Sequence, residues 1–169
     1  MRAVLLSLSL ASLSGCNLVK GPPRDHECRA TLRTIMGHEA AFYSRTQRYS
    51  VHPVEVGFAP APGNRYLYLF APKGDLTRRD ELASPPLEEA VGYGPDTRKR
   101  GVLLEDLLTK LPAELRALTG LEGECPKCEL TVACVGNLDD DADLDVWTIS
   151  TKDRAEAVRG TPLHHLRDL

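Results

Sequence analysis

The chain opens with a short apolar segment that ends at a cysteine, and this start sets the conditions under which the rest must fold. Arg2 gives a positive tip, residues 3–13 are apolar apart from serines, and Ser14 and Gly15 precede Cys16. A positive tip, a short apolar run and small residues before a cleavage point are typical of an export signal. The run is too short to cross a bilayer, because a spanning helix needs about 20 apolar residues. We therefore expect the rest of the chain to fold in an oxidising compartment.

Hydrophobic spacing predicts one long helix and three secure strands. The helix is expected over residues 25–47, with Asp25 as N-cap and apolar residues at helical spacing: Cys28, Leu32, Ile35, Met36 and Phe42 or Tyr43. The strands are expected over residues 65–71, 129–135 and 144–150. In the first strand Tyr66, Tyr68 and Phe70 alternate with leucines, so both of its faces should be covered. We expect Trp147 and this aromatic row to belong to the core.

The segments between and after these elements are more polar. Residues 72–123 are expected to be an insertion with helical pieces near 86–90 and 102–118, the second of them split at Pro112. Residues 151–169 are expected to be a coiled tail whose His164 and His165 are solvated. One helix, a strand, inserted helices and a hairpin form an α+β pattern, a long N-terminal helix packed on a small antiparallel sheet. The whole of residues 25–169 suits one domain.

Four cysteines remain once Cys16 is set apart, and an even number in an exported chain favours disulfides. Three pairings are possible, and we favour Cys28–Cys134, joining helix to sheet, with Cys125–Cys128 as a short local bridge. Zinc binding is the less favoured alternative. A thioredoxin-like role for Cys125-Pro126-Lys127-Cys128 is disfavoured, because such a motif needs its first cysteine at a helix N-terminus and here a strand follows.

The acidic loop between the last two predicted strands is the main candidate for a metal site. Alternating side-chain oxygens could surround Ca²⁺, which takes 6–8 oxygen ligands: Asn137, Asp139, Asp141, Asp143 and Asp145. The loop is not an EF-hand, since the turn glycine and the closing glutamate are both missing. The alternative is a plain turn, in which Asn and Asp cap the backbone with their own side chains. No cofactor is expected to be required.

Composition excludes some classes of function. The chain has a net charge of -3 and a pI near 6.0, and it has no basic stripe with interleaved aromatics, so no nucleic-acid partner is expected. No nucleophile elbow, phosphate-binding loop or paired-carboxylate arrangement is present. We therefore expect a protein that is not an enzyme.

Residues 13–16, Leu-Ser-Gly-Cys, resemble the lipobox of bacterial lipoprotein precursors. The resemblance implies a signal peptide at 1–15, cleavage before Cys16, lipidation of that cysteine with fatty acids such as palmitate, and a tether at 16–24. Several acyl chains together anchor a protein stably to a membrane. Because Asn17 stands where Asp would direct retention in the inner membrane, the resemblance favours the outer membrane of the cell envelope.

Two further stretches resemble the globular head of type IV pilins and pseudopilins. The first is residues 31–50 followed by Val56-Gly57-Phe58, and the second is residues 133–150. The second contains a Gly-Asn-x-Asp-x-Asp-x-x-x-Asp-x-Trp-x-Ile pattern, here Gly136, Asn137, Asp139, Asp141, Asp145, Trp147 and Ile149. The resemblance implies a long helix packed on an antiparallel sheet.

The sequence departs from pilins just before the predicted helix. Pilins carry there an unbroken apolar helix that forms the filament core, whereas residues 17–27 read NLVKGPPRDHE. Together, the resemblances predict a non-catalytic, lipid-anchored pilin-like envelope protein, accessory to a type IV pilus or a type II secretion-like system. Its partners would be the membrane and proteins of that machine. The alternative is a calcium-binding or adhesion module of the envelope unconnected to pili.

Overall fold

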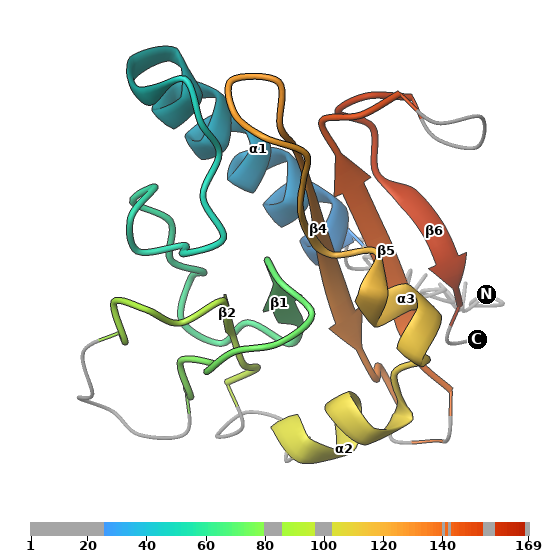
Figure 1. Ribbon diagram of the computed structural model, residues 1–169. Coiled ribbons are helices and arrows are strands. Elements are labelled where there is room, and N and C mark those ends of the chain that lie inside the picture. The colour runs from blue at the N-terminus through green and yellow to red at the C-terminus, as the bar shows by residue number, and fades with distance from the viewer. Residues whose placement is uncertain are drawn as a thin grey trace, which may run out of the picture.

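The computed structural model describes residues 26–79, 86–96, 103–139, 141, 143–153 and 158–167. The longest element is helix α1 (His26–Thr46), which crosses one face of a twisted sheet (Figure 1). Two short helices, α2 (Leu104–Lys110) and α3 (Ala113–Ala117), lie on the opposite side. The strands are β1 (Leu67–Leu69), β2 (Gly92–Tyr93), β3 (Gly120–Glu122), β4 (Glu129–Gly136), β5 (Asp145–Ser150) and β6 (Leu163–Leu166). The expected α+β arrangement, with an N-terminal helix on an antiparallel sheet, is confirmed.

Within the described residues these strands form a single six-stranded sheet. Neighbours follow the order β2-β1-β4-β5-β6, and β3 pairs with β4 beside the end of β1. Every pair of named strands is antiparallel. The central pair, β4 and β5, places Cys134 opposite Trp147 and Gly136 opposite Asp145.

Both faces of the central strands are buried, as the apolar alternation in the sequence predicts. On the α1 side, Tyr66, Tyr68 and Phe70 meet apolar residues of the helix, including Leu32 and Ile35. On the other side the leucines of β1 meet α2 in a second cluster: Leu67, Leu69, Leu104, Leu107, Leu111, Ala133, Val135, Leu144 and Val146. Burying an apolar side chain of this size contributes about 1.5–3 kcal/mol, so the two clusters hold the three layers together.

Helix α1 ends at Thr46, one residue before the predicted boundary. Gln47 has a left-handed backbone, φ 58°, and its N–H donates to the Tyr43 carbonyl at 2.8 Å. A left-handed residue after the last helical turn is a common way to end a helix, and glycine usually occupies it. The chain therefore reverses sharply here without a glycine.

The polar segments depart from the predictions at two places and agree with them at a third. The expected coil at 151–169 is wrong in part, because β6 pairs with β5 along the sheet edge. The expected helical piece near 86–90 is a single turn, since the following residues join the sheet: Phe70 N–H donates to the Val91 carbonyl at 2.8 Å. The predicted split at Pro112 is confirmed, with α2 ending before it and α3 beginning after it.

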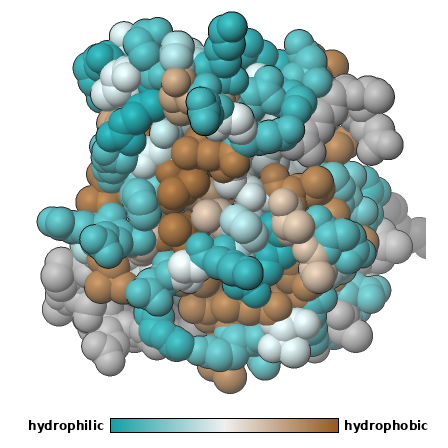
Figure 2. Space-filling model, in the orientation of Figure 1, coloured by the Kyte–Doolittle hydropathy of each residue, from teal (hydrophilic) through white to brown (hydrophobic). Residues whose placement is uncertain are grey.

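The sequence-based signal peptide and tether, residues 1–24, together with Cys16, lie outside the described residues. Among the residues that the structure does describe, no helix combines the length and the apolar character needed to cross a bilayer. Figure 2 shows apolar side chains through the middle of one face, with hydrophilic side chains around them.

Candidate functional site

The base of the β4–β5 hairpin is organised by a buried carboxylate, Asp145, which is only 1% exposed. The Tyr66 hydroxyl donates to its Oδ2 at 2.7 Å, and the Trp147 indole N–H lies 3.1 Å from both oxygens. His164 Nε2 lies 2.8 Å from Oδ1. Donors around a buried carboxylate offset the cost of removing its charge from water. Asp145 therefore joins β5, β6 and the residue just before β1 at one point.

Gly136 makes room for this arrangement. A Cβ at this position would lie 2.7 Å from two carbons of the Tyr66 ring, closer than side chains pack. The absence of a side chain lets the ring lie against β4, directly opposite Asp145 in register. Burial, together with the hydrogen bond to Asp145, raises the pKa of Tyr66 well above its usual range, so its hydroxyl remains a donor. The Gly-to-Asp spacing of the hairpin pattern thus has a packing reason.

Trp147 is enclosed by polar groups on its ring faces. The His164 ring stacks on it with centroids 4.0 Å apart and an interplanar angle of 8°. The Arg29 guanidinium lies 5.5 Å from the indole centroid, from the first turns of α1. The expectation that Trp147 is a core residue is confirmed. The expectation that His164 is solvated is wrong, because β6 brings it onto Trp147 and Asp145.

The acidic loop itself has the hydrogen bonds of a turn. The Asn137 side-chain amide donates to the Asp141 carbonyl at 2.7 Å, and Asp143 N–H donates to Asp141 Oδ1 at 2.7 Å. Asp139 Oδ1 lies 3.4 Å from Asp141 N. Such contacts from Asn and Asp side chains to nearby backbone are usual in turns.

Of the five candidate calcium ligands, Asp145 is directed inward to the hairpin base and away from the loop's own hydrogen bonds. Across the described part of the chain, no three His, Cys, Asp or Glu side chains are grouped to hold a metal ion. Calcium binding by the loop stays a prediction from sequence. In the structure, Asp145 instead contacts Tyr66, Trp147 and His164.

The four cysteines form two disulfides. Cys28 in the first turn of α1 bonds to Cys134 in the middle of β4, with Cα atoms 6.0 Å apart. Cys125 bonds to Cys128 in the turn before β4, with Cα atoms 4.4 Å apart. These are the two pairs that the sequence favours. The first bond ties helix to sheet through the core, and the second closes a surface turn.

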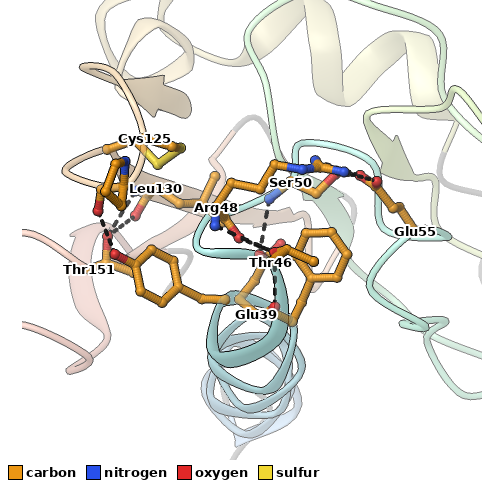
Figure 3. The surroundings of a disulfide bond; sticks show 12 residues. Glu39, Thr46, Arg48, Ser50, Glu55, Cys125, Leu130 and Thr151 are labelled. Carbon is orange, nitrogen blue, oxygen red and sulfur yellow. Dashed lines mark hydrogen bonds and ion pairs between the residues drawn. A yellow bond between two sulfur atoms is a disulfide. The ribbon is translucent and has the colours of Figure 1, made fainter.

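A buried acid, Glu39, was not identified from the sequence, although its helical spacing from Ile35 and Phe42 places it on the buried face of α1. Its side chain is 0% exposed, and Ser50 N–H donates to its Oε2 at 3.2 Å. Figure 3 shows it pointing from α1 toward Ser50, beside the paired Arg48 and Glu55. Burial, above all, together with the nearby charge of Glu55 raises its pKa to about 7, against the opposing hydrogen bond from Ser50.

A hollow of about 540 Å³ lies where α3 meets β3 and β4. Leu118, Leu121 and Thr131 line it, and Lys152 stands at one side with its ammonium 2.8 Å from Glu122 and 3.5 Å from Glu129. The ion pairs satisfy these charges, and the lining contains no nucleophile–base pair. The lining of the hollow thus combines apolar and charged side chains and contains no reactive group.

Asp145→Asn is expected to lower the free energy of unfolding by about 2 kcal/mol, since hydrogen bonds to a charged group each contribute about 1.5–3 kcal/mol and an amide turns one acceptor into a donor. Asp143→Asn, in the exposed loop, is the matched control and should change it by less than about 0.5 kcal/mol. Urea unfolding followed by Trp147 fluorescence measures both. Equal effects for the two substitutions would show that the hairpin base is not the stabilising centre.

Comparison with known proteins agrees with this description. No family model matches the chain. The type IV major pilin protein PilA of Myxococcus xanthus (strain DK1622) is 27% identical over 157 residues, an alignment that covers 83% of this chain and 71% of that protein. The match is weak in identity but extends over most of the chain. Together with the N-terminal helix on an antiparallel sheet, it supports a pilin-like domain in this protein.

Proposed function

We propose that this chain is a non-catalytic pilin-like protein of the cell envelope, held at a membrane by lipid on Cys16 and accessory to a type IV pilus or related secretion machine. The observation that carries the proposal is the similarity to a type IV major pilin over 83% of the chain. The hairpin base supports it, because Gly136, Asp145 and Trp147 of the resembling pattern meet in one packing unit.

A structural role suits the arrangement of charge in the domain. The most deeply buried acids, Glu39 and Asp145, are placed within the packing between helix, loop and sheet. Neither of them lines the hollow at α3 and β3. Buried polar groups that are hydrogen-bonded in this way help to hold packed elements in one arrangement.

Membrane attachment is proposed from the sequence before α1. Lipid on Cys16 would place α1 after a tether of only about nine residues, which extended spans about 30 Å. The domain would then stay close to the membrane surface, where a pilus or secretion machine is assembled. Outer rather than inner membrane is favoured by Asn17.

Cys16→Ala is expected to abolish incorporation of labelled palmitate and to move the protein from the detergent phase to the aqueous phase, since one or more acyl chains supply the membrane affinity. Ser14→Ala, which keeps both the cysteine and a small residue, is the matched control and should behave as wild type. Phase partitioning with fatty-acid labelling measures both. A Cys16→Ala protein that partitions like wild type would rule out the lipid anchor.

The partner is tested separately, on the full chain in its native envelope. After crosslinking and affinity purification, pilins or pilus-assembly proteins should be enriched at least about tenfold over a lipoprotein of unrelated fold carrying the same tag. Recovery of envelope proteins without any pilus or secretion component would favour the adhesion alternative instead.

A further inference from the structure

We propose that the Cys125–Cys128 disulfide is a thiol–disulfide exchange site whose substrate is a dithiol, and that Cys125 is the sulfur attacked. The two disulfides of the domain differ sharply in access. Cys28 and Cys134 are each 0% exposed, whereas Cys125 belongs to an exposed turn and only its partner Cys128, 5% exposed, is covered. Exchange requires a thiolate to reach a disulfide sulfur, so access selects which bond reacts.

The turn gives the two sulfurs of this bond different surroundings. Cys125, Pro126 and Lys127 are exposed, and the covered Cys128 leads directly into β4. An attacking thiolate therefore reaches Cys125 and displaces Cys128. The displaced sulfur leaves as a thiolate and then takes up a proton. Helix geometry of the thioredoxin type is not needed, because the chain supplies the disulfide and the partner supplies the nucleophile.

The exchange balances without any further reactant. The first thiolate of the dithiol bonds to Cys125, the Cys125–Cys128 bond breaks, and Cys128 takes the electron pair. The second thiolate of the dithiol then attacks its own neighbouring sulfur, which releases Cys125 as a thiolate. The chain is reduced by two electrons and the dithiol is oxidised to a disulfide, while the thiolates take up protons from water.

The oxidation state is linked to the end of α1 through one contact. The Tyr43 hydroxyl donates to the Pro126 carbonyl, which lies inside the disulfide ring, and the Tyr43 ring stacks on Tyr49 at 4.6 Å. The same end of the helix lies beside Glu39, Arg48 and Ser50 (Figure 3). Opening the ring gives Pro126 more freedom, so reduction loosens the connection between this turn and α1. The exchange site thus controls how firmly the turn is held.

Exchange rates of the two disulfides in the same native sample provide the test. The full-length protein in detergent is exposed to limiting dithiothreitol, the thiols are alkylated at intervals, and each cysteine is quantified by peptide mass mapping. Cys125 and Cys128 are expected to become alkylated at least about tenfold faster than Cys28 and Cys134, because only their bond is accessible. In guanidinium chloride, where burial is lost, the two rates should come within about threefold.

The attacked sulfur and the helix contact each have a direct measurement. With glutathione, a monothiol, the transient adduct is expected on Cys125 and the free thiol on Cys128. Tyr43→Phe, which removes the hydroxyl bonded to Pro126, should speed native exchange about threefold or more by freeing the turn. Tyr49→Phe keeps the stacked ring and should leave the rate as in wild type.

Several results would overturn the proposal. Equal native rates for the two disulfides, or faster reduction of Cys28–Cys134, would show that access does not select the bond. A glutathione adduct on Cys128 would refute the assignment of Cys125 as the attacked sulfur. A rate difference that persists unchanged in guanidinium chloride would show that the fold has no part in the selection.

Discussion

Removing the disulfide between Cys28 and Cys134 is expected to cost about 5 kcal/mol of unfolding free energy. The bond closes a loop with a sequence separation of 106 residues, and in the chain-entropy model a loop of about 100 residues restricts the unfolded chain by about 4.7 kcal/mol. Native domains are stable by only about 5–15 kcal/mol, so a double Cys28→Ala, Cys134→Ala protein should be close to unfolding at 37 °C. Alanine avoids placing a hydroxyl in the core, and urea unfolding at neutral pH measures the loss.

The second disulfide provides the control for this effect. Cys125 and Cys128 are separated by 3 residues, for which the same model gives about 2 kcal/mol. The double alanine variant of this pair should therefore remain folded, with a clearly smaller shift in urea midpoint. Comparable losses for the two pairs would mean that loop closure does not account for the stabilisation.

Glu39 is expected to give the domain a pH-dependent stability that decreases between about pH 4.5 and 7. Its pKa is about 7 in the folded protein against an ordinary 4.5. The folded state therefore holds a proton that the unfolded state has released, and stability decreases as pH rises through this window. The total is about 3 kcal/mol, because one pKa unit corresponds to 1.36 kcal/mol. Above pH 7 the protein carries the full cost of a buried charge.

Glu39→Gln is expected to remove this dependence. The variant should match wild type near pH 4 and exceed it by up to about 3 kcal/mol at pH 8, since the amide keeps the shape of the protonated acid. Denaturant unfolding at a series of pH values measures the difference in unfolding free energy between the two proteins. The titration of all other groups is common to both proteins and cancels in this difference. A constant offset between the two proteins from pH 4 to 8 would contradict the assignment.

Glu55→Gln is the matched control. Hydrogen bonds from Arg48 and Ser50 lower the pKa of Glu55, so its ionised form stabilises the fold and that contribution is lost only as pH falls below about 4.5. The variant should therefore keep the decrease between pH 4.5 and 7. The two substitutions thus separate the effect of the buried acid from that of the exposed pair formed by Glu55 and Arg48.

The main elements could be predicted from the sequence because their patterns are long and periodic. Helix α1 and strands β4 and β5 carry enough apolar residues at fixed spacing to determine their type and nearly their bounds. The double-sided burial of β1 follows from Tyr66, Tyr68 and Phe70 alternating with leucines. The split at Pro112 follows from the geometry of the proline ring, which clashes with the preceding helical turn and removes a backbone N–H donor.

The missed elements are short strands whose pairing partners decide their structure. Strands β2, β3 and β6 have 2, 3 and 4 residues, too few for a period to appear. In β6 the polar pair His164 and His165 resembles a solvated tail, and only the edge of β5 turns it into a strand. The hydrogen bond between Tyr66 and Asp145 could not be predicted either, because the sequence does not show which aspartate of the loop points toward Tyr66.

The bond between Cys28 and Cys134 also determines how the domain would carry mechanical load. A pull applied at the N-terminal end of α1 enters the domain only two residues into that helix and passes through the sulfur bridge directly to the central strand. The chain between the two cysteines, with a separation of 106 residues, bears no tension and cannot be drawn out while the bridge is intact. Reduced, the same segment could release about 350 Å of additional extended length, at about 3.3–3.6 Å per residue. With the bridge intact, a load that enters at α1 therefore passes to β4 without extending the chain between the two cysteines.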